Sequence, residues 1–472
     1  MVTTQNTYAD IFNALRQHAP ALAQTTAAER IAKLKRLHNL LMSRRTDLQK
    51  AVYQDMQKPA EECDLTELFP VLASIRFATP RLAGWLKPKS VATPLPMLGT
   101  TSHILYEPKG TALIISPWNY PFNLSFDPLV SAIAAGNSVL LKPSELTPHC
   151  AELMQNIVNE LFAPNEVQLI QGDAAVATEL LKLPFNHIFF TGSPHIGKIV
   201  MRAAAENLSS ITLELGGKSP AIVDETAQIN DAAQKIAWGK YSNNGQTCIA
   251  PDYVLVHHSQ EQALVDALKK HIAHFYGSND AEQISSKSYG RIVNQHHFNR
   301  LLLLLQNAVN GGATISTGGT YNEDENFISP TVLQNLAPND ELLQQEIFGP
   351  ILPIIAYKTI DEALSIINAQ NKPLSLYIFT EKTQNADFII ENTTAGGTCV
   401  NNTLIHFFNH NLPFGGVNNS GIGKTHGFFG FEAFSNARGI VRQKIPLAAT
   451  QLMYPPYSKR EKTIIDLSIK YL

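Results

Sequence analysis

Cysteine is scarce in this chain of 472 residues, which has four: Cys63, Cys150, Cys248 and Cys399. None of them forms a Cys-x-x-Cys pair, and their spacing is unlike that of a disulfide scaffold. This cysteine usage is typical of proteins from reducing compartments, so we expect a cytoplasmic protein. A reactive thiol can persist in such a compartment.

The chain also lacks a large excess of either positive or negative charge, and it lacks long apolar runs. The chain has 37 basic and 40 acidic residues, a net charge of −3, and no extended basic run. We therefore expect no nucleic-acid partner. No stretch approaches the ~18 apolar residues of a membrane-spanning helix, so no span is expected. Residues 1–16 lack the pattern of a secretory signal. The small apolar segment 463–472 predicts a packing helix in preference to one lying on a membrane surface.

The chain is too long for a single hydrophobic core, so two or more domains are expected. Its composition, 44% hydrophobic and 16% charged, is that of an ordinary globular protein. The first ninety residues predict helices, because Thr26-Ala27-Ala28-Glu29 has the form of a capping box and apolar residues then recur at helical spacing. We expect this helical segment to cover another part of the protein.

Two series of short, β-rich apolar runs alternate with helical stretches. This alternation predicts strand-helix-strand units, and therefore an α/β fold with a parallel, doubly wound, Rossmann-like sheet followed by a second α/β domain. The runs of the first series are 112–115, 138–141, 167–170 and 187–190, and those of the second are 220–223, 253–256, 351–355, 374–379 and 398–401.

Two glycine-bearing phrases contain the residues with the strongest chemical implication. They are Leu213-Glu214-Leu215-Gly216-Gly217-Lys218 and Asn244-Gly245-Gln246-Thr247-Cys248-Ile249-Ala250-Pro251. A thiol that can attack and a carboxylate that can activate water together suggest covalent catalysis. Alone, such a cysteine is more often an inert core residue, and such a glutamate more often marks the end of a strand.

Further phrases occur along the chain in the order found in aldehyde dehydrogenases, and the chain resembles that family from about Ala27 to Pro456. The phrases are Ile115-Ser116-Pro117-Trp118-Asn119, Leu141-Lys142-Pro143-Ser144-Glu145, Phe190-Thr191-Gly192-Ser193, Glu346-Ile347-Phe348-Gly349-Pro350 and Pro413-Phe414-Gly415-Gly416.

The resemblance implies a division of the chain into three parts. Residues 1–89 and 109–217 would form the NAD(P)-binding domain, with a return segment near 420–440. Residues 218–419 would form the catalytic domain. Residues 90–108 and 441–472 would form a small β arm for oligomerisation and the C-terminal tail.

The resemblance also implies the chemistry of the site. Cys248 would add to an aldehyde carbonyl, and loss of hydride to NAD or NADP would leave a thioester on its sulfur. Glu214 would activate the water that hydrolyses the thioester. The side-chain amide of Asn119 and the backbone N–H of Cys248 would stabilise the oxyanion.

The cofactor site is expected at the turn between the run 187–190 and the next helix. A strand, a glycine turn and a helix N-terminus form a phosphate site, although Gly192 and Gly197 do not match the G-x-G-x-x-G pattern. By resemblance the cofactor residues are Trp118, Lys142, Glu145, Gly192, Ser193, Gly197, Glu346 and Phe348. Glu145 favours NAD and Lys142 opposes that preference, so the sequence does not decide between NAD and NADP.

Several phrases are similar to the class 3 branch of the family, including Pro117-Trp118-Asn119-Tyr120-Pro121-Phe122-Asn123. This similarity implies a homodimer and an aromatic or medium-to-long aliphatic aldehyde substrate. Asn418 stands where that branch would have glycine.

Aromatic side chains near the motif residues are candidates for the walls of the substrate pocket. Tyr120 and Tyr241 are the main candidates, and Phe122, Phe407 and Phe408 are more often core residues. No metal site is expected, because His406 and His410 lack a cysteine or carboxylate at ligand spacing.

Two other functions remain open from the sequence alone. Cys248, Glu214 and Lys218 are the residue types of Cys-Glu-Lys amidohydrolases, which need no nicotinamide. A non-catalytic member of the family is the second alternative.

Overall fold

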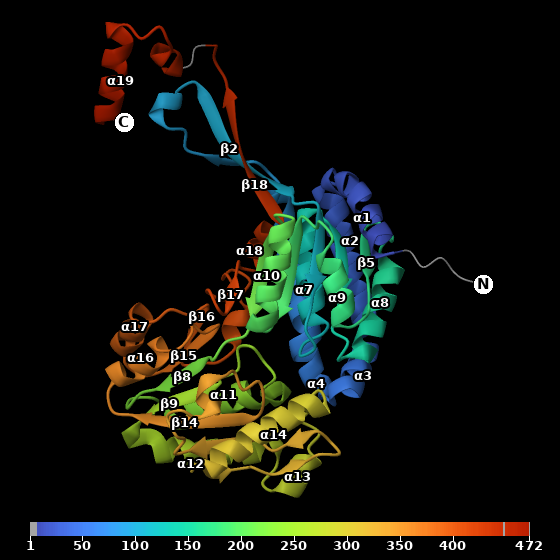
Figure 1. Cartoon of the computed structure of the whole chain (residues 1–472), viewed down its shortest axis with the longest axis vertical. Helices are drawn as coiled ribbons and strands as arrows, with labels where there is room; N and C mark the ends of the chain where they lie inside the picture. The colour runs from blue at the N-terminus through green and yellow to red at the C-terminus, as the bar shows by residue number, and fades with distance from the viewer. Residues whose placement is uncertain (1–6, 447–448, 472) are drawn as a thin grey trace, which may run out of the picture.

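The computed structural model describes residues 7–446 and 449–471. It contains two large sheets, each covered by helices, and a narrow arm that projects from the lobe built on the first sheet (Figure 1). The predicted α/β fold with two parallel sheets is confirmed.

The first sheet has six strands, and every pairing in it is parallel except that of the short edge strand β17. Its central strands are buried throughout, as expected for continuous apolar runs covered on both faces. In spatial order the strands are β17 (Gly421–Ile422), β7 (Ser210–Leu215), β6 (His187–Gly192), β3 (Thr111–Ile115), β4 (Ser138–Lys142) and β5 (Val167–Leu169).

Helices cover both faces of this sheet, including those predicted for the first ninety residues (Figure 1). The capping box at Thr26 and Glu29 is present, and Thr7 and Asp10 form a second one. The helices are α1 (Tyr8–Ala23), α2 (Ala27–Ser43), α3 (Arg45–Met56), α4 (Ala60–Cys63), the π-helix η1 (Asp64–Leu68), α5 (Phe69–Ala78), α6 (Leu82–Trp85), α7 (Asn123–Ala135), α8 (Pro148–Leu161), α9 (Ala174–Leu181), α10 (Pro194–Glu206) and α18 (Gly427–Ala433).

The second sheet has seven strands, and only the pairing of its edge strand β10 is antiparallel. In order they are β10 (Thr314–Thr317), β13 (Thr331–Gln334), β14 (Ile351–Tyr357), β9 (Tyr253–His257), β8 (Pro220–Val223), β15 (Ser375–Phe379) and β16 (Gly397–Val400). Its main helices are α11 (Ile229–Tyr241), α12 (Glu261–Tyr276), α14 (Gln295–Asn310), α16 (Ile360–Asn368) and α17 (Thr383–Glu391).

Shorter elements lie in the connections. They are the 3₁₀ turns η3 (Ser242–Gly245), η4 (His258–Gln260) and η5 (Ile405–Phe408), the helices α13 (Asp280–Ile284) and α15 (Glu341–Gln344), and the hairpin of β11 (Tyr321–Asn322) and β12 (Phe327–Ile328).

The arm is a three-stranded antiparallel sheet made from two distant parts of the chain. Strands β1 (Lys89–Val91), β2 (Thr100–Pro108) and β18 (Ser435–Gln443) pair in that order, and a 3₁₀ turn, η2 (Leu95–Met97), joins the first two. Beyond β18 follow η6 (Ala449–Met453) and α19 (Lys459–Tyr471), which has no buried residue. Among the described helices, none is both long and apolar enough to cross a membrane.

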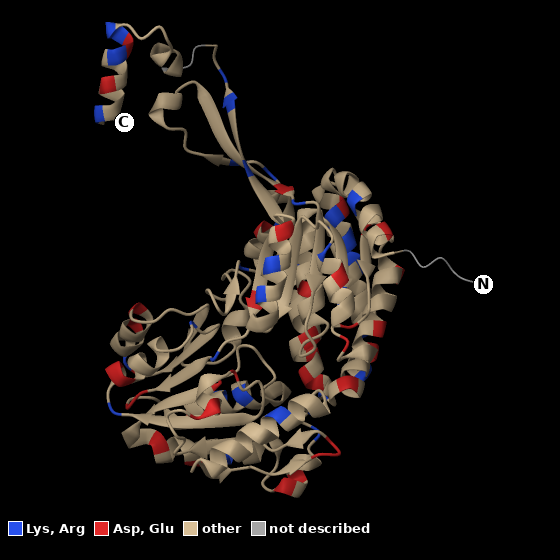
Figure 2. Cartoon of the chain, in the orientation of Figure 1, with Lys and Arg blue, Asp and Glu red and all other residues tan. Residues whose placement is uncertain are grey.

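Acidic and basic residues are interspersed over both lobes (Figure 2). This mixed distribution agrees with the nearly balanced charge of the whole sequence.

Candidate active site

Glu214 comes from a strand of the first sheet, and Cys248 from a connection that leads into the second sheet. Glu214 lies near the end of β7, opposite Thr191 of β6. Cys248 follows the turn η3, in which Asn243, Asn244 and Gly245 all have positive φ, between 51° and 72°. Asparagine and glycine tolerate this left-handed conformation, so the Asn-Asn-Gly sequence allows the turn that carries Cys248 toward the first sheet.

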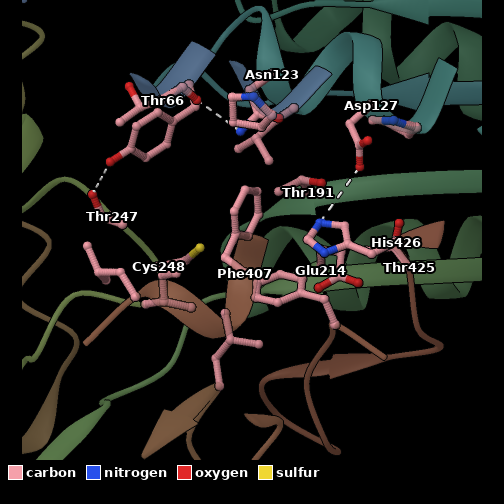
Figure 3. Close-up of a pocket in the computed structure, with 18 of the residues that line it drawn as sticks. Thr66, Asn123, Asp127, Thr191, Glu214, Thr247, Cys248, Phe407, Thr425 and His426 are labelled. Atoms are coloured by element: carbon pink, nitrogen blue, oxygen red, sulfur yellow. Dashed lines mark hydrogen bonds and ion pairs between the residues drawn. The ribbon is translucent and has the colours of Figure 1, made fainter. Parts of the chain in front are cut away.

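Two pockets meet at these residues, because both Cys248 and Glu214 line each of them. The first pocket has a volume of about 840 Å³ and mostly apolar walls (Figure 3). Its walls include Pro70, Tyr120, Leu124, Ile249, Leu404, Phe407, Phe408 and Phe414. The second pocket, of about 750 Å³, is lined by Pro117, Trp118, Asn119, Gly192, Ser193, Gly216, His297, Arg300, Glu346 and Phe348, among others.

The environment of Cys248 disfavours the thiolate form of its side chain. Burial, assisted by the carboxylates of Glu346 and Glu214, raises the pKa of the thiol to about 12. The backbone N–H groups of Cys248 and Ile249 act in the opposite direction. Positive charge brought into the second pocket would therefore favour the thiolate.

Glu214 has a carboxylate without a protein hydrogen-bond partner, although both of its oxygens are buried. Burial raises the pKa of Glu214 well above its ordinary value, the Lys424 ammonium lowers it, and Asp127 raises it further. A carboxylate of raised basicity with free oxygens is suited to take a proton from water.

Asn119 is 2% exposed and is fixed at both its amide and its carbonyl. The side-chain nitrogen Nδ2 carries two N–H groups. One of them donates to the backbone carbonyl of Gln246 at 2.9 Å, and the other is not used in this hydrogen bond. The backbone carbonyl of Asn119 accepts hydrogen bonds from Asn243 Nδ2 at 2.9 Å and from Lys58 Nζ at 3.2 Å. The amide is thus held beside the segment that carries Cys248.

The predicted glycine turn lies at the end of β6 and the start of α10. Ser193 is the N-cap of α10, and its hydroxyl accepts from the N–H of Ile196. A Cβ at Gly192 would lie 2.5 Å from Phe190, and one at Gly197 would lie 2.7 Å from Leu215. Gly192 and Ser193 line the second pocket, whereas Gly197 allows α10 to pack against β7.

Glu346 and the aromatic pair Trp118 and Phe348 complete this pocket. Burial and the neighbouring Asp252 raise the pKa of Glu346 to about 8, and its Oε1 has no partner. Trp118 and Phe348 pack edge to face, with ring centroids 5.4 Å apart, and Phe348 has φ of 52°. A positive φ at a bulky residue is strained, which is common where a site fixes a side chain.

The sequence did not indicate His297 or Arg300, which also line the second pocket. The His297 ring lies 5.0 Å from that of Trp118, and burial lowers the pKa of His297 to about 4. Arg300 donates to the carbonyl of Ile347 at 2.7 Å. Neither residue belongs to a glycine-bearing phrase, so no local signal identified them.

Lys142 and Glu145 form an ion pair just beyond β4, with Nζ and Oε2 3.0 Å apart. The Lys142 side chain is 4% exposed and that of Glu145 is 42% exposed. The pair lies beside a separate small pocket that Glu145 lines together with Gly172.

The structure places the two candidate tyrosines differently. Tyr120 lines the apolar pocket, and its hydroxyl bonds Thr247 Oγ1 at 2.5 Å. Tyr241 lines neither of the two pockets. It lies in the core of the second sheet, where its hydroxyl donates to the carbonyl of Thr331 at 3.0 Å. Phe407 and Phe408 line the pocket, and Phe122 is a core residue.

Residues 2–440 match the model of the aldehyde dehydrogenase family. The chain belongs to this family. It is 45% identical over 432 residues to the 4,4'-diaponeurosporen-aldehyde dehydrogenase of Staphylococcus aureus, a match that covers 92% of this chain and 93% of the relative. It is 40% identical to the dimeric NADP-preferring aldehyde dehydrogenase of Mus musculus, over 90% of this chain and 93% of the relative.

Solved structures give the same result. The substrate-bound state of Staphylococcus aureus AldH has a TM-score of 0.93 at 42% identity and covers 98% of this chain and 100% of its own. The NAD+ complex of a Bacillus cereus aldehyde dehydrogenase has a TM-score of 0.83 at 26% identity, covering 92% and 89%. This aldehyde dehydrogenase is therefore an NAD(P)-dependent oxidoreductase that acts on aldehydes.

The residues of the second pocket fit a nicotinamide dinucleotide. Glu346 offers an unpartnered buried oxygen, and Gly192 lines the pocket at the turn before α10. Ser193 and the helix N-terminus can bind phosphate. Trp118 and Phe348 are aromatic walls.

The amidohydrolase alternative is not favoured by the family match or by the position of Lys218. Its ammonium is already bound by Asp252 Oδ2 at 2.6 Å and by the carbonyls of Leu342 and Gln345. Lys218 lines neither of the pockets that Cys248 and Glu214 share.

Proposed function

We propose that this aldehyde dehydrogenase converts an apolar aldehyde to its carboxylic acid through a thioester on Cys248. The observation that supports this proposal most directly is the position of Cys248 and Glu214 on both pockets, one apolar and one suited to a dinucleotide. A nucleophile and a base at such a junction can act in turn on one carbonyl carbon.

In the first step the Cys248 thiol gives its proton to solvent, and the thiolate Sγ attacks the carbonyl carbon. The electron pair of the carbonyl moves to oxygen and a thiohemiacetal forms. The negative charge that develops on oxygen is stabilised by the second amide N–H of Asn119 and the backbone N–H of Cys248. Such preorganised donors contribute about 3 kcal/mol each. Because Gln246 and Asn243 already fix Asn119, its amide needs little reorganisation during the step.

Loss of hydride from the same carbon then converts the thiohemiacetal to a thioester. The nicotinamide, when bound, supplies the hydride acceptor. The residues that would hold the cofactor are Trp118, Lys142, Glu145, Gly192, Ser193, Glu346 and Phe348, with Gly197 allowing the close packing of α10. Either NAD or NADP is compatible with the Lys142–Glu145 pair.

Glu214 acts in the last step, in which water cleaves the thioester. Its free, buried oxygens accept the proton of the attacking water, and the acid leaves while Cys248 regains its thiol. The raised basicity of Glu214 supports this role.

The substrate class follows from the walls of the apolar pocket. An aromatic or medium-to-long aliphatic substrate would bury its apolar surface against the rings of Phe407, Phe408 and Phe414. These rings provide no hydrogen-bond or ionic partner for a charged substrate. The relative from Staphylococcus aureus is named for 4,4'-diaponeurosporen-aldehyde.

We also propose a separate role for each of three parts of the chain. Residues 1–89 and 109–217, with the return segment near 420–440, bind the cofactor, and residues 218–419 carry the nucleophile. Residues 90–108 and 441–472 join two copies in a homodimer, as the name of the dimeric mouse relative suggests. The cytoplasmic location remains a prediction from cysteine usage.

The test is a panel of aldehydes offered with NAD and with NADP, read by the absorbance of reduced nicotinamide. We expect kcat/KM to rise with apolar chain length or with an aromatic ring. A preference for short, charged aldehydes would contradict the proposed substrate class, and no reduction with any aldehyde would contradict the activity.

A further inference from the structure

An ion pair with almost no solvent exposure lies behind the oxyanion site. The Lys58 and Glu67 side chains are 1% and 0% exposed, and Lys58 Nζ lies 2.7 Å from Glu67 Oε1. Lys58 follows α3, and Glu67 belongs to η1. Neither residue lines the two pockets, so neither can touch the aldehyde or the cofactor.

The Lys58 ammonium contacts two neighbouring residues of the active-site segment that joins β3 to α7. It donates to the carbonyl of Asn119 at 3.2 Å. It also lies 4.2 Å from the centre of the Tyr120 ring, within the range of a cation–π contact. Asn119 carries the proposed oxyanion donor, and the Tyr120 hydroxyl bonds Thr247, the residue before Cys248.

Glu67 holds the other end of the same segment. Its Oε2 accepts the backbone N–H groups of Phe122 and Asn123 at 3.1 Å each, at the start of α7. A carboxylate at this place also complements the positive end of the helix. The ion pair therefore spans the segment from Asn119 to Asn123.

Glu67 lies in the π-helical turn η1, a kind of turn that changes the direction of side chains. A π turn contains one residue more than an α turn and so shifts the side chains that follow it. Such turns are frequent at functional sites, because they direct a side chain that a regular helix would point elsewhere. The adjacent Glu62 accepts the N–H of Asn243 at 2.7 Å, so the same helical region also holds the turn before Cys248.

The stability of the folded protein is a weak explanation for a buried ion pair such as Lys58–Glu67. The cost of removing two charges from water often equals or exceeds their attraction, and apolar replacements are frequently neutral or stabilising. A fixed geometry is the more specific consequence. We propose that Lys58 and Glu67 are positioning residues for the reaction, which hold the Asn119 amide and the Tyr120–Thr247 contact in the orientation that the oxyanion requires.

This inference rests on the proposed function, and an assay without cofactor separates the two. Cys248 can give its thiol proton to solvent, attack p-nitrophenyl acetate as the thiolate, form the C–S bond and expel p-nitrophenolate, which leaves an acetyl thioester. Water, deprotonated by Glu214, then cleaves the thioester to acetate and returns the Cys248 thiol. That reaction needs the oxyanion donors and no hydride transfer. It therefore measures the orientation of Asn119 without a bound cofactor.

The decisive variant is K58M/E67Q, which removes both charges together and leaves a Gln carbonyl to accept the N–H groups of Phe122 and Asn123. We expect a folded protein with unchanged NAD affinity and ester KM, but with kcat for the ester lower by about tenfold to a hundredfold, as for a misplaced catalytic group. The control, K33M/E166Q, removes the partly buried Lys33–Glu166 pair and should keep the wild-type kcat.

Wild-type kcat in a folded K58M/E67Q variant would overturn the positioning role. Should that variant not fold, E67Q alone decides: a several-fold fall in kcat at constant KM supports the inference, and an unchanged kcat overturns it. If the unaltered protein neither oxidises aldehydes nor cleaves the ester, the proposed function itself has failed.

Discussion

Glu346 and Gly216 face each other so closely that any side chain at Gly216 would collide with the Glu346 carboxylate. Gly216 follows Glu214 in the chain, and Glu346 comes from the second sheet's lobe, so the contact joins the two halves of the site. The carboxylate is thereby kept beside the pocket that Cys248 lines. It is also the largest charge contribution to the raised pKa of the Cys248 thiol.

Replacing Glu346 by Gln should therefore make the thiol more reactive. Removing this negative charge lowers the pKa of Cys248 from about 12. Below that pKa, the thiolate fraction increases on the order of tenfold for each unit by which the pKa falls. Alkylation of the cofactor-free enzyme by iodoacetamide should be several-fold faster in E346Q at about pH 9, where Glu346, with a pKa of about 8, is ionised in the wild type. The exposed Glu341 provides the control variant E341Q, and equal rates in E346Q and the wild type would refute the electrostatic coupling.

Replacing Cys248 by Ser should abolish aldehyde oxidation, because a serine hydroxyl in this site has no comparable nucleophilicity. Calorimetry should show that NAD still binds, since Cys248 is only one of the residues that line the second pocket. Cys63, Cys150 and Cys399 are buried, and C399S should remain active. Appreciable turnover by C248S would exclude Cys248 as the nucleophile.

Replacing Glu214 by Gln should separate the two halves of the reaction. The first hydride transfer needs no base at this position, so a rapid-mixing experiment should show a burst of reduced nicotinamide of about one equivalent per active site. Turnover should then stall, because the thioester is not hydrolysed. Loss of the burst itself would assign Glu214 a role before hydride transfer.

Replacing Glu145 by Gln should shift the cofactor preference toward NADP. The change removes a carboxylate that would repel a 2′-phosphate, and it frees the Lys142 ammonium from its 3.0 Å ion pair. The ratio of kcat/KM for NADP to that for NAD should rise, while E152Q, on the exposed face of α8, should leave it unchanged. An unaltered ratio in E145Q would show that the ribose is recognised elsewhere.

The arm can be tested through Val441, which is 52% exposed on the edge strand β18. A charge there should weaken an interface between two copies, since a paired arm would bury this side chain. Light scattering should show V441D shifted toward the monomer relative to the wild type. V309D, at a 39% exposed position of α14, is the control. A fully dimeric V441D would place the interface elsewhere.

The sequence indicated the site where the information was local. Cys248, Glu214, Asn119 and the glycine turn each lie in a short contiguous phrase, and the structure brings them together. Asn418, in place of an expected glycine, has φ of 55°, which asparagine tolerates better than other side chains.

Non-local contacts were the part that the sequence could not indicate. Lys58 and Glu67 resemble ordinary charged residues of a helical region, and their role depends on Asn119 and α7 far along the chain. Tyr241 lies close to Cys248 in sequence but on a helix face turned into the core. Strand β10 was missed because its residues, Thr314–Thr317, are largely polar and pair only at a sheet edge.

The thioester on Cys248 is the central claim, and intact mass spectrometry of E214Q tests it most directly. After mixing with NAD and an apolar aldehyde, we expect the protein to gain the mass of the aldehyde less two hydrogen atoms, on the peptide that contains Cys248. An unmodified Cys248 in protein that has reduced its equivalent of NAD would contradict the mechanism.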